Sequence, residues 1–317
     1  MRTVAAGIGA LACVWVASCA PSDVATSSPD LQSPAVETAS PSVTTTVLSE
    51  TDRSTYSTTT TLISTSTTTT SGSTMVVNAT TSTVPLVLAI GSERASFPSP
   101  ADIVFGHSVL DEPLVVARRG DTTGARILII GSIHGDEDAG VAIVNSLIEG
   151  ETPPGIELWL VPTMNPDGNQ LQQRHNANGV DLNRNFPERW APLAEPGNWQ
   201  YAGPTAASEP ETAAMVALGE MISPDLVLWY HQDLFRITPT TGRNGEIRAR
   251  YAELTGLPLL TVSGGTYTGT ASQWSRTVTT SNGTGFTIEL GPSLTEDEVR
   301  IHADAVRAVA TEFFSAN

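Results

Sequence analysis

Four side chains that could support metal-dependent hydrolysis follow short apolar runs in this chain. His134 and Glu137 lie three residues apart, shortly after the apolar run 127–130. His231 follows a second apolar run, and Glu289 lies in a third. Two His and one Glu can hold Zn²⁺ and leave its fourth tetrahedral position open for water. The pattern therefore predicts His134, Glu137 and His231 as zinc ligands, with Glu289 as a carboxylate that could take a proton from water.

The individual signals have alternative explanations. His-x-x-Glu by itself is a weak pattern, because surface polar residues often produce it. His231 alone could be a buried structural histidine. Glu289 is harder to explain in this way, since an unpaired carboxylate in an apolar strand is costly to bury. The interpretation depends on all four residues lying at strand ends of one fold.

The rest of the chain predicts such a fold. Buried strands are expected near residues 114–117, 127–130, 156–162, 226–230 and 286–290. Helices are expected over residues 141–149, 208–221, 246–255 and 296–314, the second beginning with a capping box at Ser208. Strands that alternate with helices indicate an α/β class, here a three-layer α/β/α sandwich with a mostly parallel mixed central sheet. Such sheets bind ligands beyond the carboxyl ends of their strands.

Composition and charge restrict the partners. All sixteen basic residues are Arg, and the formal net charge is −17. Binding to nucleic acid requires clustered positive charge, so we expect no nucleic-acid partner.

The N-terminal third differs from the rest. Residues 1–19 predict a lipoprotein-type signal peptide, because a short apolar core ends in Val-Ala-Ser-Cys, which resembles a lipobox with Cys19 as the lipidated residue. Residues 20–99 are rich in Ser, Thr and Pro and predict a disordered stalk, followed by a folded domain over 100–317. We expect an exported lipoprotein anchored in a bacterial cell membrane and facing the cell wall. A secreted protein with an ordinary signal peptide is the alternative.

Six sequence blocks add a more specific signal. They are H-G-D-E at 134–137, N-P-D-G at 165–168, D-L-N-R-N-F-P at 181–187, S-E-P-E-T at 208–212, His231 after a strand and T-I-E-L at 287–290. In this order the blocks resemble the zinc carboxypeptidase family, the carboxypeptidase A-like metallopeptidases. The resemblance extends over residues 103–317 and favours the branch of bacterial murein peptide amidases, which trim peptidoglycan peptides.

The resemblance implies roles around one zinc ion per chain. His134, Glu137 and His231 match the positions of the family's zinc ligands, and Glu289 matches its general base. Asp181 matches a carboxylate that orients a ligand histidine, an arrangement common around zinc.

The resemblance also implies how substrate is held. Arg174 would polarise the scissile carbonyl, and Asn183 and Arg184 would bind the terminal carboxylate of the substrate. A planar guanidinium suits a carboxylate because it can donate two parallel hydrogen bonds. Tyr267 is the candidate for the family's mobile active-site tyrosine.

Together these features predict a zinc metallocarboxypeptidase or amidase that cleaves a peptide bond next to a free terminal carboxylate, with peptidoglycan fragments as the expected source of substrate. Ser272 and Gln273, near the expected specificity pocket, select neither acidic nor basic side chains. One alternative is a zinc acylase of small N-acyl amino acids, as in aspartoacylases and succinylglutamate desuccinylases, which share His-x-x-Glu and Asp-Leu-Asn-Arg. The other is a non-catalytic module that binds the cell wall.

Overall fold

The structure is a computed structural model that describes residues 98–261, 263–265 and 267–315. The expected signal peptide, its Cys19 and nearly all of the expected stalk lie outside the described residues, so these assignments stay predictions. None of the described helices has the length and apolar character needed to span a bilayer.

The described residues form one mixed sheet of seven strands in the order β1-β2-β4-β3-β5-β7-β6. The strands are β1 (Ala101–His107), β2 (Pro113–Gly120), β3 (Ala125–Ile130), β4 (Ile156–Val161), β5 (Leu226–Gln232), β6 (Arg236–Ile237) and β7 (Thr284–Leu290). The four central strands β4, β3, β5 and β7 are parallel, while β1, β2 and β6 pair antiparallel at the edges. The predicted mostly parallel mixed sheet is confirmed.

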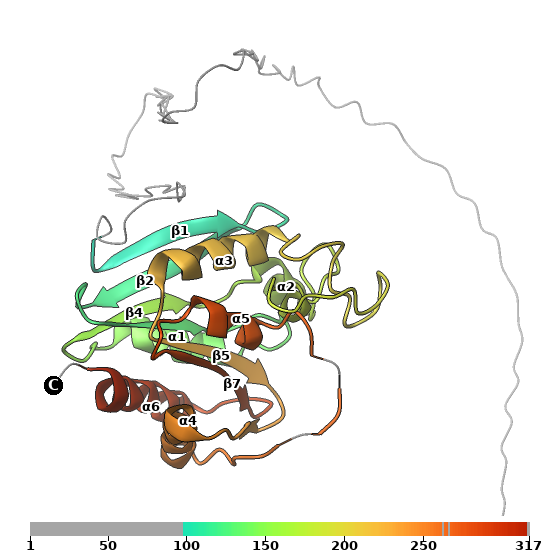
Figure 1. The fold of residues 1–317 in the computed structure, drawn as a ribbon. Helices are drawn as coiled ribbons and strands as arrows, with labels where there is room; N and C mark the ends of the chain where they lie inside the picture. Colours follow the sequence, from blue (N-terminus) through green and yellow to red (C-terminus); the bar gives the residue numbers. More distant parts are fainter. Residues whose placement is uncertain (1–97, 262, 266, 316–317) are drawn as a thin grey trace, which may run out of the picture. The chain divides into compact units, whose positions relative to one another are not determined.

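Helices cover both faces of this sheet (Figure 1). α1 (Ala139–Glu149), α4 (Gly242–Thr255) and α6 (Glu296–Phe314) pack on one face. α3 (Pro210–Ile222) and α5 (Ala271–Val278) pack on the other. Each face has its own apolar core, so the predicted three-layer α/β/α arrangement is confirmed. The short helices α2 (Pro166–Leu171) and η2 (Leu182–Arg184) lie in the long polar segment between β4 and α3.

Strand β7 shows how alternation presents a polar residue from an apolar strand. Phe286, Ile288 and Leu290 are buried in the core beneath α1, α4 and α6. Thr287 and Glu289 are half-buried and point to the opposite face. The sheet therefore turns Glu289 toward the face that α5 covers.

The predicted capping box at Ser208 is wrong. The N-cap of α3 is Glu209, and its side chain caps no backbone amide of the helix. Instead its carboxylate accepts hydrogen bonds from Asn176 and Asn178, both at 2.8 Å, and from the Ser208 hydroxyl at 2.7 Å. The long polar loop thus binds the carboxylate at the start of α3, and the serine hydroxyl donates to that carboxylate rather than capping the helix.

Candidate metal centre

The candidate site lies at the carboxyl ends of three neighbouring parallel strands. β5 pairs in parallel with β3 on one side and with β7 on the other. His134 and Glu137 lie in the loop between β3 and α1, and His231 lies at the end of β5. Glu289 is the register partner of His231 on β7. This is the edge at which open α/β sheets bind ligands.

The loop after β3 is fixed by close packing against α2. A Cβ added at Gly135 would lie 1.9 Å from the carbonyl carbon of Gly168, so only glycine fits there. Asn165, the N-cap of α2, donates from Nδ2 to the carbonyl oxygens of Ile133 at 3.2 Å and Arg174 at 3.3 Å. The ligand-bearing loop and the start of the long polar loop are therefore held together.

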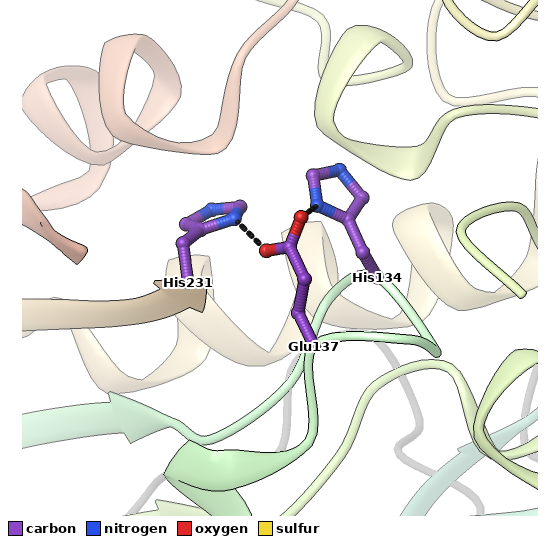
Figure 2. Close-up of side chains that lie close together, drawn as sticks. All are labelled: His134, Glu137 and His231. Atoms are coloured by element: carbon purple, nitrogen blue, oxygen red, sulfur yellow. Dashed lines mark hydrogen bonds and ion pairs between the residues drawn. The ribbon is translucent and has the colours of Figure 1, made fainter. Parts of the chain in front are cut away.

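Three side chains converge at this edge. Donor atoms of His134, Glu137 and His231 all lie within 4.8 Å of one another. Figure 2 shows the carboxylate of Glu137 between the two imidazole rings. His134 Nδ1 lies 2.8 Å from Glu137 Oε1, and His231 Nδ1 lies 2.7 Å from Glu137 Oε2. No second cluster of three such ligands occurs in the part of the chain that the structure describes.

The surroundings of these side chains fit a zinc ion. Nε2 of His134 lies 3.1 Å from Oδ1 of the buried Asp181, which leaves Nδ1 directed at the centre. A carboxylate on the outer nitrogen of a ligand histidine is typical of zinc sites. The backbone amide of Gln232 donates to Glu137 Oε2 at 3.2 Å and so holds the carboxylate in place. The donor set of two imidazoles and one carboxylate is that of catalytic zinc.

The two carboxylates of the centre are ionised. Burial raises the pKa of Glu137, but the charge of His231 and hydrogen bonds from both histidines outweigh burial and hold that pKa well below its usual range. Burial also raises the pKa of Asp181, and His134, Arg174 and Arg184 together hold it below its usual range. The negative charge suits a divalent cation.

Glu289 lies close to the metal centre but makes no hydrogen bond to the three ligand side chains. Burial raises the pKa of Glu289, with a further increase from Glu137, while the positive charges of His231 and Arg236 lower it. The net pKa lies above the ordinary value of 4.5. A carboxylate with a raised pKa beside a metal centre is suited to accept and return a proton.

Arg174 lies at the rim of the centre. Its Nη2 and Nε donate to Asp181 Oδ2 at 2.8 and 3.2 Å, and its Nη1 lies 3.3 Å from Glu137 Oε1. Trp199 stacks against the other side, with the Arg174 Cζ atom 5.3 Å from the ring centre. The structure therefore places Arg174 between Asp181 and the candidate ligand Glu137, at the rim of the centre.

The expected carboxylate-binding residues lie next to the centre as well. Asn183 Nδ2 lies 3.4 Å from His231 Nε2, and Asn183 Oδ1 accepts from the amide of Ala271 at 3.0 Å. Arg184 is buried, and its Nε has no hydrogen-bond partner. Its Cζ lies 5.6 Å from the ring centre of Tyr267, which is 53% exposed. Arg184 thus lies beside Asn183 and an exposed tyrosine, with its Nε buried and unpartnered.

Sequence reasoning missed two residues near the site. Gln232 accepts from the amide of Ala139 at 2.8 Å and donates to the carbonyl oxygen of Pro292 at 2.9 Å, so it ties α1 to the segment after β7. Its position directly after His231 was the only signal. Arg236 lies on the two-residue strand β6, opposite Glu289, and nothing in the sequence pattern indicated that pairing.

Comparisons with known proteins agree with this geometry. Residues 53–233 match a family model described as zinc carboxypeptidase. Murein peptide amidase A of Escherichia coli (strain K12) is 34% identical over 194 residues, which cover 58% of this chain and 79% of that relative. Carboxypeptidase D of Mus musculus is 32% identical over 139 residues, 35% of this chain and 9% of that relative.

Solved structures show the same similarity. The murein-tripeptide amidase from Escherichia coli O157 has a TM-score of 0.55 and 30% identity, covering 68% of this chain and 94% of that one. Carboxypeptidase A from Helicoverpa armigera has a TM-score of 0.56 at 18% identity, covering 66% of this chain and 67% of that one, which indicates the shared fold. Glu289 lies beyond the residues that the family model matches, so its role is argued from its position.

Proposed function

This chain belongs to the zinc carboxypeptidase family, and from that premise we propose that it hydrolyses the last bond of peptides that end in a free carboxylate. The observation that carries the proposal is the convergence of His134, Glu137 and His231 at one sheet edge, with the guanidinium of Arg184 nearby, whose buried Nε has no hydrogen-bond partner. A zinc ligand set and a carboxylate receptor at one site are what cleavage next to a chain end requires.

The metal would be held by His134, Glu137 and His231. When bound, zinc supplies a Lewis acid that polarises the scissile carbonyl and lowers the pKa of water. Asp181 holds His134 in the orientation that directs Nδ1 to the centre. Gln232 holds the Glu137 carboxylate through its backbone amide.

Glu289 would act as the proton carrier. It lies beside His231 on the neighbouring strand and makes no hydrogen bond to the ligand set among the described residues. Its raised pKa brings it closer to neutral pH than an exposed glutamate, which favours both taking a proton from water and returning it to the leaving amine. Arg174 would stabilise negative charge that develops on the carbonyl oxygen.

Binding of the substrate would depend on Arg184 and Asn183. The buried Nε of Arg184 has no partner, whereas its Nη1 donates to the carbonyl oxygen of Asn183 at 2.7 Å. This bond holds the guanidinium in place, and a substrate carboxylate would supply the acceptor that Nε lacks. Tyr267, exposed beside Arg184, would cover the bound residue.

The relatives support a substrate derived from peptidoglycan. Relatives at 33–34% identity carry the name murein peptide amidase A, and the family model is that of zinc carboxypeptidases. Both favour peptides over small N-acyl amino acids as substrates. The expected lipid anchor at Cys19 and the location facing the cell wall belong to the same proposal, because they would bring the enzyme to this substrate.

Product analysis tests the proposal. Zinc-loaded protein is incubated with peptidoglycan-derived peptides, with the same peptides amidated at their free carboxylates, and with N-acyl amino acids, and products are identified by mass spectrometry. We expect release of a terminal residue from the free-acid peptides and little product from the other two. Preferred hydrolysis of N-acyl amino acids would instead indicate an acylase.

A further inference from the structure

A small polar cavity lies at the opposite end of β7 from the metal centre. β6 pairs only with Ile288 and Glu289, so the amino-terminal half of β7 has no strand neighbour on that side among the described residues. The cavity lies beside this half, where Thr284 and Gly285 form part of its lining. A rise of about 3.3 Å per residue puts Thr284 roughly 16 Å from Glu289 along the strand. The cavity is therefore distinct from the proposed catalytic site.

Helices on the two faces of the sheet each contribute an arginine to this cavity. Arg248 comes from α4 and Arg276 from α5, and both line it. The two helices pack on opposite faces of the sheet (Figure 1). Neutral polar side chains make up much of the remaining lining: Thr240, Asn244, Thr279, Thr280 and Ser281. No carboxylate is among the described residues that line the cavity.

Arg248 is held by neutral acceptors only. Its Nη1 donates to the carbonyl oxygen of Thr238 at 2.7 Å and its Nη2 to that of Gly285 at 3.4 Å. Its buried Nε has no hydrogen-bond partner, and no ion pair between described residues includes it. Burial lowers the pKa of this guanidinium, and the positive charge of Arg276 lowers it further. Both effects disfavour the charged form, so a bound anion would relieve them.

Arg276 has no counter-charge either. It is exposed and makes no hydrogen bond or ion pair to another described residue. Arg250 shows the contrast, because on the same helix as Arg248 it pairs with Glu253 at 2.9 Å and with Glu312 at 2.8 Å. The two arginines of the cavity are thus like charges that the protein leaves unbalanced.

The chain does not lack carboxylates that could balance this charge. Its formal net charge is −17. Asp225 accepts a hydrogen bond from the hydroxyl of Thr280, which lines the cavity, but its other oxygen pairs with Arg126 at 3.5 Å. The first turn of α4, which supplies Asn244 to the lining, contains no acidic residue and has no side-chain cap. The positive end of that helix therefore adds to the charge of the arginines.

We propose that this cavity binds a phosphate group. Two guanidinium groups from different elements, with hydroxyl groups around them, suit a tetrahedral anion better than a planar carboxylate, which one guanidinium can satisfy. The volume of about 250 Å³ is below the roughly 300–1,000 Å³ of pockets for drug-sized ligands and suits a group of this size. A free phosphate ester and the phosphodiester of a lipid headgroup share this chemistry. The inference does not depend on the proposed function.

Calorimetry on the zinc-loaded full chain, freed of excess zinc, tests the inference at constant ionic strength. Inorganic phosphate and glycerol 3-phosphate carry a terminal phosphate, glycerophosphocholine carries only a phosphodiester, and acetate is the carboxylate control. We expect one phosphate probe to bind per chain at concentrations at which acetate does not. Binding of glycerophosphocholine indicates a lipid headgroup as the source, and binding of the other two alone indicates a free phosphate ester. No binding of any phosphate probe, or equal binding of acetate, overturns the inference.

Substitutions of arginine locate the bound anion. Arg276→Gln changes an exposed side chain without protein contacts, so the variant should fold and bind the phosphate probe at least about tenfold more weakly. Arg248→Gln should weaken binding as well. Arg250→Gln removes the same charge from α4 outside the cavity and should bind as the wild type does. Affinity that survives Arg276→Gln overturns the inference.

The metal centre is the other place where phosphate could bind. Binding in the cavity should be the same in the metal-free chain and in Arg184→Ala, because neither change touches α4, α5 or the start of β7. Binding that disappears with the zinc ion or with Arg184 would place the anion at the metal centre and overturn the inference.

Discussion

Asp181→Asn should weaken zinc binding without removing a ligand. Four hydrogen bonds end on this buried carboxylate: Oδ1 faces His134 Nε2 at 3.1 Å and accepts the amide of Asn183 at 2.9 Å, and Oδ2 accepts Arg174 Nη2 and Nε at 2.8 and 3.2 Å. An asparagine side chain has one oxygen, so at least two of these bonds lose their acceptor. The negative charge beside His134 disappears as well.

The structure sets the size of the effect. Loss of the carboxylate behind a ligand histidine typically costs about 10–100-fold in metal affinity, or about 1.4–2.7 kcal/mol. We place Asp181→Asn in the upper half of this range, because the guanidinium of Arg174 also loses the carboxylate that holds it. Its positive charge can then move closer to the zinc ligand Glu137. Competition with a chromophoric chelator measures zinc affinity, with free and bound metal both quantified.

A second aspartate provides the control. Asp225 precedes β5, at the opposite end of that strand from His231, and accepts hydrogen bonds from the amide of Arg126 at 2.9 Å and the hydroxyl of Thr280 at 2.8 Å. Asp225→Asn should lower stability while zinc affinity stays near that of the wild type. If Asp181→Asn binds zinc as tightly as Asp225→Asn, the reasoning about the outer carboxylate is refuted.

Three further predictions concern other parts of the chain. Arg184→Ala should reduce kcat/KM for free-acid peptides by a factor that corresponds to roughly 1.5–3 kcal/mol of lost transition-state binding, and should affect amidated peptides far less. An equal loss for both kinds of peptide would make Arg184 structural. Burial lowers the pKa of His302 from 6.5 to about 4. Between these pH values the unfolded chain binds more protons than the folded chain, so the free energy of unfolding should decrease by up to about 3 kcal/mol as the pH is lowered. Urea titrations at about pH 7 and pH 4.5 measure this decrease, and the His302→Asn variant should lack the part that His302 causes. Cys19→Ala should move the protein from the membrane fraction to the soluble fraction, and unchanged partitioning would end the lipid-anchor proposal.

The sequence predicted the metal centre because its ligands follow predictable elements. His134 and Glu137 lie directly after a buried strand, and His231 ends another, so strand prediction alone places them at one edge. The placement of Glu289 followed from the alternation of polar and apolar residues in one strand. Local periodicity is enough for such residues, because parallel strands in one sheet share their ends.

Long-range pairing explains what the sequence did not show. The strand expected near residues 114–117 is longer in the structure: β2 continues to Gly120, and its Arg118 pairs with the buried Glu157 of β4. β6 has only two residues, too few to show an alternation of polar and apolar side chains, so its pairing of Arg236 with Glu289 was not predictable. Contacts of this kind depend on which strands become neighbours in the sheet, and the local sequence pattern does not predict the order of the strands.

The central claim is that Glu289 carries the proton in a zinc-dependent hydrolysis. Glu289→Gln removes the charge with little change of shape, and the ligands His134, Glu137 and His231 are untouched. The measurement is the single-turnover rate on a peptidoglycan-derived peptide, taken on the folded variant with zinc content and substrate affinity determined in the same preparation. Our account predicts about one zinc per chain, retained substrate binding and a rate at least about 10²-fold below that of the wild type. A near-normal rate in a folded, zinc-loaded Glu289→Gln protein would contradict it.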